Sequence, residues 1–159
     1  EARCLTLLMR QQPVAKDLRN ISTALKMITD MERIGDQAAD IAELSTRFEK
    51  INTMAVVKHL PQMAKITISM VHDSINAFIH GDLELAKKVI KTDDEVDSLF
   101  ESVKIDIISI LIDDKNMADD AIDTLMIAKY LERIGDHAVN ICEWVEFYFT
   151  GEHKNQRIL

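Results

Sequence analysis

Two similar stretches, a hundred positions apart, organise this chain. The first is Met31-Glu-Arg-Ile-Gly-Asp-Gln-Ala-Ala-Asp-Ile-Ala-Glu43, and the second is Leu131-Glu-Arg-Ile-Gly-Asp-His-Ala-Val-Asn-Ile-Cys-Glu143. Each places apolar residues three and four positions apart and contains no proline, which is the pattern of an amphipathic helix. A repeat over this distance indicates two copies of one helical unit. The sequence therefore predicts an all-α protein of tandem three-helix bundles.

The composition agrees with long helices. The 159 residues include only four Gly and two Pro, and aromatic residues make up 5% of the chain. Aliphatic side chains must therefore fill the core, as they do in helix bundles. The net charge of −8 gives no electrostatic basis for binding nucleic acid or an anionic membrane surface. No apolar run approaches the roughly 18 residues needed for a membrane-spanning helix.

Helix breakers divide the chain into four long helices and a fragment of a fifth. The fragment is residues 1–9, which read as the end of a helix whose beginning is missing. The long helices are expected over 13–50, 61–80, 83–112 and, after an N-cap at Asn116, up to Thr150. Gly81 should end one of them, and Asp82 should cap the next.

The positions of the two copies predict how the units divide. Residues 1–52 are expected to hold the end of the second helix and the third helix of a first unit. Residues 53–150 should form a complete second unit of three helices, and residues 151–159 a frayed polar tail. The first unit is thus expected to be incomplete and to leave an apolar face exposed. Since monomers rarely tolerate such a face, the sequence predicts a homodimer.

Two seams of residues at alternating spacings of three and four mark the core of the second unit. One runs through Ala86, Val89, Asp93, Val96, Phe100, Val103, Ile107 and Ile110. The other runs through Ile127, Leu131, Ile134, Ala138, Ile141, Val145 and Tyr148. Asp93 is the exception within this apolar set, because an unpaired carboxylate in a core position is costly.

Carboxylates one helical turn apart recur along the chain. Residues four apart share a helix face, with Cβ atoms about 5–6 Å apart, so paired acids repel each other unless a cation lies between them. Oxygen ligands on facing helices suit hard cations such as Mg²⁺, Mn²⁺ or iron. The candidate ligands are Asp93, Asp97, Glu132, Asp136, Asn140, Glu32, Asp36 and Asp40.

Two other interpretations of these features stay open. Charged rows at this spacing are often solvated faces, and Arg33 or Arg133 could neutralise the acids. Gly35 and Gly135 each cost about 1 kcal/mol in a helix interior relative to Ala. Either a neighbouring helix or a ligand must approach closely there to offset that cost.

Catalytic patterns are not found in the sequence. A carboxylate-bridged di-metal enzyme of the ferritin-like type needs Glu-x-x-His on two helices, and no Glu here is followed by His three residues later. Single histidines such as His137 are interpreted as polar surface. The two cysteines form no CxxC pair, which suits a reducing cytosol. A cytosolic protein that is not an enzyme is therefore expected.

Several segments resemble the PhoU family. The helix segment 132–141 resembles its signature, and Gln12-Pro-Val-Ala-Lys-Asp-Leu-Arg19 resembles the start of the third helix of its first repeat. Gly81-Asp82 together with Asp93-Asp-Glu-Val-Asp97 resembles the helix turn and acids of its second repeat. The resemblance implies a regulator of phosphate uptake and phosphate-starvation signalling, acting on the ATPase of a phosphate ABC transporter and on a sensor histidine kinase.

The resemblance also implies metal clusters on acidic pairs. The matching pairs are Asp93 with Asp97, Glu132 with Asp136, and Glu32 with Asp36. The chain departs from the family pattern because helices that would supply partners for the last pair are missing. Gln37 and Asp40 also replace the His and Asn of the second copy. An alternative is that the segment is the PhoU-like cytosolic part of a sodium–phosphate transporter.

Overall fold

Long α-helices make up most of the part of the chain that the structure describes. The computed structural model describes residues 1–11, 14–48, 57–153 and 156–157. The helices are α1 (Ala2–Gln11), α2 (Ala15–Ser45), α4 (Leu60–His80), α5 (Leu83–Asp113) and α6 (Ala118–Thr150), with a short 3₁₀ turn, η1 (Lys115–Met117), before α6. The predicted all-α class is confirmed.

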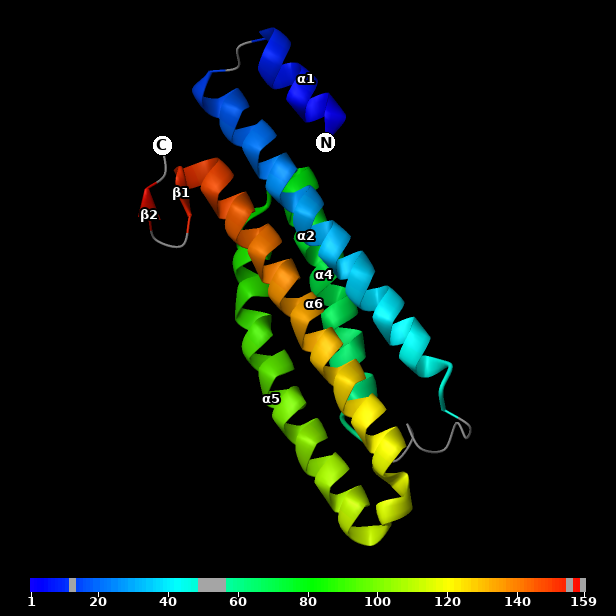
Figure 1. Cartoon of the computed structure of the whole chain (residues 1–159). Helices are drawn as coiled ribbons and strands as arrows, with labels where there is room; N and C mark the ends of the chain where they lie inside the picture. The colour runs from blue at the N-terminus through cyan, green and yellow to red at the C-terminus, as the bar shows by residue number, and fades with distance from the viewer. Residues whose placement is uncertain (12–13, 49–56, 154–155, 158–159) are drawn as a thin grey trace.

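The helices form one elongated bundle around α6 (Figure 1). α4, α5 and α6 pack against one another as a three-helix unit, and α2 lies along α6. α1 rests on α2 near one end of the bundle. The division into a first unit at residues 1–52 and a second unit of three helices at residues 53–150 stays a prediction.

The two predicted seams form the core. In α5, Ala86, Val89, Val96, Val103 and Ile107 are buried, and in α6 every seam residue from Ile127 to Val145 is buried. Asp93 is only half-buried, as are Phe100, Ile110 and Tyr148. The apolar residues of both seams therefore hold α5 and α6 together, and Asp93 lies at the edge of their contact.

The turn between α4 and α5 follows the prediction. Gly81 has φ 65° and ends α4 in a left-handed cap, and the side chain of Asp82 accepts a hydrogen bond from the backbone N–H of Leu85 at 2.9 Å. Gly151, with φ 77°, ends α6 in the same way. Both glycines adopt a backbone conformation that a side chain would strain.

Two predicted helix boundaries differ from the structure. The N-cap at Asn116 is wrong, because Asp114 accepts the backbone N–H of Asn116 at 2.9 Å and caps η1 instead. The second helix was expected to reach Lys50, but α2 ends at Ser45. Hydroxyl groups compete for its last carbonyls there: the Thr46 hydroxyl donates to the carbonyl of Glu43 at 2.7 Å. Pro13 and Lys50 lie outside the described residues.

The polar tail is more ordered than predicted over part of its length. β1 (Glu152–His153) and β2 (Gln156–Arg157) pair antiparallel after α6. The imidazole ring of His153 stacks on the indole of Trp144 with ring centroids 3.8 Å apart. This aromatic contact holds β1 against α6.

Candidate metal centre

The acids of the second repeat gather where α5 faces α6. Asp93 and Asp97 come from α5, and Glu132 and Asp136 come from α6. Each pair lies one turn apart on its helix, as the spacing predicts. The charges of Asp136, Asp97 and Glu132 all act on Asp93. The structure therefore brings these four carboxyl groups into one patch, which is called the acidic seam below.

Asp93 is the most perturbed member of the acidic seam. Its pKa is raised from 3.8 to about 6, with burial as the largest cause, followed by the neighbouring charges of Asp136, Asp97, Asp94 and Glu132 in that order. Both effects disfavour the ionised carboxylate. A cation bound here would act in the opposite direction, because it stabilises the charged form of every acid around it.

Asp136 is perturbed in the same direction. Burial is the largest cause of its raised pKa, followed by the charges of Glu132 and Asp97, while Lys129 and His137 lower it. Lys129 forms an ion pair with Glu132 one turn away on α6. This lysine offsets part of the negative charge of the acidic seam. The acidic seam therefore keeps an excess of negative charge.

Gly135 lets α5 and α4 approach α6 beside these acids. A Cβ atom at this position would lie 3.3 Å from Oδ1 of Asp93 and 3.7 Å from side-chain atoms of both Met70 and Val96. The first distance is tighter than ordinary van der Waals contact. Close helix packing thus explains why glycine is needed here. The nearest atom to this position, Oδ1 of Asp93, belongs to the acidic seam.

The carboxylate oxygens of the acidic seam are suitable ligands for a hard cation, although the four groups do not converge on one point. Carboxylate oxygens from two helices are what Mg²⁺, Mn²⁺ and iron bind. Among residues 1–11, 14–48, 57–153 and 156–157, no three His, Cys, Asp or Glu side chains converge as a ready-made ligand set. Asp97 and Asp136 are exposed, so they can change rotamer to close around an ion.

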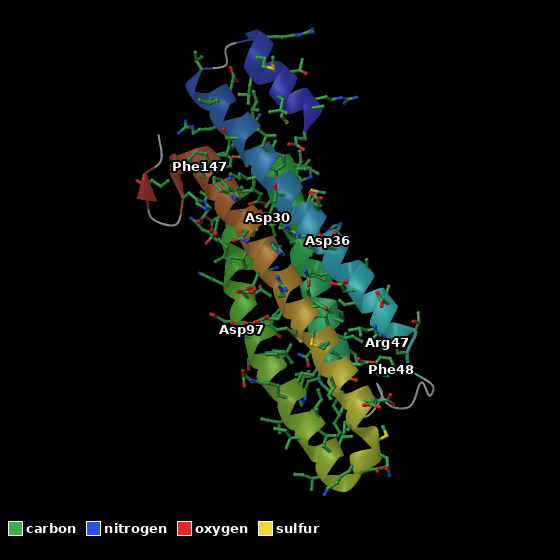
Figure 2. All side chains as sticks on the ribbon, in the orientation of Figure 1. Asp30, Asp36, Arg47, Phe48, Asp97 and Phe147 are labelled. Atoms are coloured by element: carbon green, nitrogen blue, oxygen red, sulfur yellow. The ribbon has the colours of Figure 1, made fainter. Side chains whose placement is uncertain are left out.

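The acids of the first repeat have a different environment. Figure 2 shows Asp36 on α2 and Asp97 on α5, on different sides of α6. Asp36 is exposed and pairs with Arg33 at 3.4 Å, as the solvated-face interpretation proposed. Glu32 is exposed and Asp40 is half-buried. In the described part of the chain, a Cβ added at Gly35 would meet no atom within 4 Å. Within the residues that the structure describes, the first-repeat acids are thus not brought together with partner acids.

A polar cluster between α2 and α6 was missed by sequence reasoning. Nδ1 of His137 lies 2.9 Å from Oδ1 of Asp30, and the amide of Asn140 donates to the same oxygen at 3.3 Å. Only 13% of the Asp30 side chain and 19% of the His137 side chain are exposed. The interpretation of His137 as polar surface is therefore wrong, and the amide nitrogen of Asn140 is engaged by α2.

One sequence signal pointed to this contact. His137 in the second copy corresponds to Gln37 in the first, so both copies carry a polar residue at this position; Gln37 is buried and His137 is half-buried. A polar residue at the same place in both copies indicates a position that can form hydrogen bonds between helices, and the structure shows such a contact for His137. The partner residue Asp30 lies outside the repeated stretch, so pattern alone did not indicate it. Figure 2 shows it on α2.

Comparisons with known proteins agree with this architecture. The sequence profile of the PhoU domain matches residues 1–45 and 60–145. A phosphate-specific transport system accessory protein PhoU homolog from Clostridium acetobutylicum is 39% identical over 153 residues, which are 96% of this chain and 70% of that protein. The accessory protein PhoU of Escherichia coli is 31% identical over 94% of this chain and 62% of its own length.

Solved structures give the same result. The crystal structure of PhoU from Pseudomonas aeruginosa matches with a TM-score of 0.82 and 31% identity, covering 94% of this chain and 72% of that one. The phosphate transport system regulatory protein PhoU from Streptococcus pneumoniae matches with a TM-score of 0.85 and 30% identity, covering 96% and 71%. The repeated Glu-Arg-Ile-Gly-Asp helix, the acidic seam and these matches together show that the chain belongs to the PhoU domain family.

Proposed function

We propose that this protein is a regulatory accessory protein of inorganic phosphate transport and that it is not an enzyme. The observation that carries the proposal is the similarity along almost the whole chain to proteins named as phosphate-specific transport accessory proteins. The described residues add a helical scaffold with an acidic seam and no assembled nucleophile and base. A role in binding and signalling fits these features better than catalysis does.

The acidic seam is proposed to hold an oxygen-liganded metal ion, with iron, Mn²⁺ and Mg²⁺ as candidates. The support is the raised pKa of Asp93 and Asp136, caused first by burial and then by the negative charges of neighbouring acids. Asp93 and Asp97 would supply oxygen ligands from α5, and Glu132 and Asp136 from α6. The ion would supply positive charge, so that helices whose acids otherwise repel each other are held at a fixed spacing. The first-repeat acids and Asn140 remain weaker candidates.

The proposed partners are the ATPase of a phosphate ABC transporter and a sensor histidine kinase, met in the cytosol. In the part of the chain that the structure describes, no helix combines the length and apolarity that crossing a bilayer requires. A homodimer also remains part of the proposal. The relatives described above are named accessory proteins, which favours a free-standing regulator over a segment of a sodium–phosphate transporter.

Expression in a bacterium that lacks its own phosphate-transport accessory protein tests the function. We expect the protein to return a phosphate-starvation reporter to its low parental level in phosphate-rich medium. The variant Asp93→Asn/Asp136→Asn should leave the reporter high, since it removes two acids of the seam. The matched control Asp17→Asn/Glu84→Gln, at exposed positions in the first turns of α2 and α5, should repress like the unmodified protein.

One result would overturn the accessory role. The reporter would stay high although the unmodified protein is folded and present at the level of the host's own protein. Full repression by the variant without Asp93 and Asp136 would leave the accessory role intact and remove the acidic seam from it.

A further inference from the structure

The outward face of α5 changes character along its length. One exposed stripe, at alternating spacings of three and four, faces away from the buried residues of the helix. It runs through Lys87, Lys91, Asp94, Ser98, Glu101, Ile105, Ile108 and Ile112. The first five of these residues are polar, as expected for a solvated helix face. The last three are isoleucines, with 68%, 57% and 75% of their surface exposed.

Ile105 lies beside the start of α4, and Ile108 and Ile112 lie where α5 and α6 extend beyond the rest of the second unit. His59, just before α4, meets Asp106 on α5: the backbone N–H donates to Oδ2 at 3.3 Å, and Nδ1 lies 2.8 Å from the same oxygen. α5 continues past this point to Asp113, so its last turns and the first turns of α6 form a two-helix tip (Figure 1). α4 therefore does not cover this end of α5.

The tip is strongly acidic. Residues 101–123 contain seven acidic and two basic residues. Asp113, Asp114 and Asp119 are exposed around the turn that follows Ile112. Three exposed isoleucines on one helix face therefore lie next to a cluster of negative charge. Such a surface can bind a partner that is both apolar and positively charged.

We propose that this surface, Ile105, Ile108 and Ile112 with the acids of the tip, docks a basic amphipathic helix of a partner protein. The isoleucines form a ridge that fits between the apolar side chains of such a helix. Lys and Arg on the flanks of the helix would meet the carboxylates at the rim. This inference rests on the accessory role proposed above, because it names the surface through which a partner would be met.

The charge of the tip argues against other occupants. A second copy of the chain would bring its own acidic tip, and two like-charged surfaces repel each other. An anionic membrane surface would repel it for the same reason. A basic helix is the partner for which both the apolar ridge and the charge are favourable.

A synthetic peptide tests the proposal directly. The probe is a fluorescein-labelled 18-residue peptide of Lys and Leu, with leucines on one face of the helix, and its binding to the full chain is followed by fluorescence anisotropy. We expect tighter binding, by about tenfold or more, than for a scrambled peptide of the same composition. Ile105→Gln/Ile108→Gln/Ile112→Gln should weaken binding by about tenfold, with helicity unchanged by circular dichroism.

Matched variants separate the ridge from general stickiness. Ile68→Gln/Ile79→Gln removes isoleucines of α4 that are exposed to a similar degree, 67% and 64%, and should leave the affinity within about twofold. Asp113→Asn/Asp119→Asn should weaken binding at low salt, and its difference from the unmodified protein should shrink as salt screens the charges. Equal losses from the α4 and α5 isoleucine variants would overturn the proposal, as would equal binding of the scrambled peptide.

Two further measurements identify what binds the isoleucine surface of α5 if the peptide does not. Anionic lipid vesicles that bind the unmodified protein but not the triple isoleucine variant would show a membrane face and overturn the proposal. Light scattering could also show that the unmodified protein is a dimer and that the triple isoleucine variant is a monomer. That result would show an interface between two copies and would also overturn the proposal. Failure of peptide binding alongside successful repression in cells would remove this docking surface and leave the accessory role standing.

Discussion

Replacing Gly135 with leucine is expected to destabilise the protein by about 1–3 kcal/mol. The new side chain would have to displace Asp93, Met70 and Val96, whose atoms lie within 3.3–3.7 Å of a Cβ at this position. Closely packed helices have little free space, so the neighbouring side chains cannot move far to accommodate a leucine. The loss should be measured as a change in the free energy of unfolding in urea, with helicity as the signal.

Gly35 supplies an internal control from the other copy of the repeat. Leucine there should be neutral or stabilise the protein by up to about 1 kcal/mol, because it gains helix propensity and meets no described atom within 4 Å. The gain in propensity is common to both sites, so the difference between the two variants isolates the close approach at Gly135. A loss at Gly35 as large as that at Gly135 would contradict this account and show that α2 is covered in solution.

Asp93→Asn is expected to stabilise the metal-free protein at neutral pH. The folded state holds the proton of Asp93 with a pKa of about 6, against 3.8 as the ordinary value. The folded state therefore binds more protons than the unfolded state between these values, and stability falls as pH rises through this window. Removing the charge should recover a free energy on the order of 1 kcal/mol, since the half-exposed site is partly screened by water.

The measurement is urea unfolding of both proteins in chelator from pH 4 to pH 8. The two free energies should nearly agree near pH 4, where Asp93 is protonated in the folded state. The variant should become the more stable protein as pH rises to 7. If the variant instead loses stability at pH 7 in chelator, then Asp93 is held by a favourable partner and the repulsion described for the acidic seam does not exist.

The sequence predicted those features that follow from periodicity and from helix breakers. The repeat and the apolar spacing of Val89, Val96 and Val103 determine which faces are buried, because residues three and four apart share a helix face. Gly81 and Asp82 predicted their turn because each residue has a local conformational reason to be there. Local chemistry was less informative at Asn116, where Asp114 two residues earlier provides the cap.

Only part of the site could be predicted, because spacing within a helix determines which residues share a face but not how two helices pack. The spacing of Glu132 and Asp136 puts both acids on one face, and the seam position of Asp93 puts it opposite them. The contact of Asp30 with His137 depends on how α2 packs on α6, which spacing within either helix does not determine. The two copies of the acidic pair looked alike in the sequence and differ in the structure, because Glu32 and Asp36 are exposed to solvent whereas Glu132 and Asp136 lie beside the acids of α5.

The claim on which the account rests is that the acidic seam binds a cation. Elemental analysis of the purified protein, after exposure to iron, Mn²⁺ or Mg²⁺ and removal of free ions, tests it most directly. We expect bound metal in the unmodified protein and in Asp17→Asn/Glu84→Gln, and its loss in Asp93→Asn/Asp136→Asn. Equal metal content in all three proteins, or none in any of them, would contradict the claim.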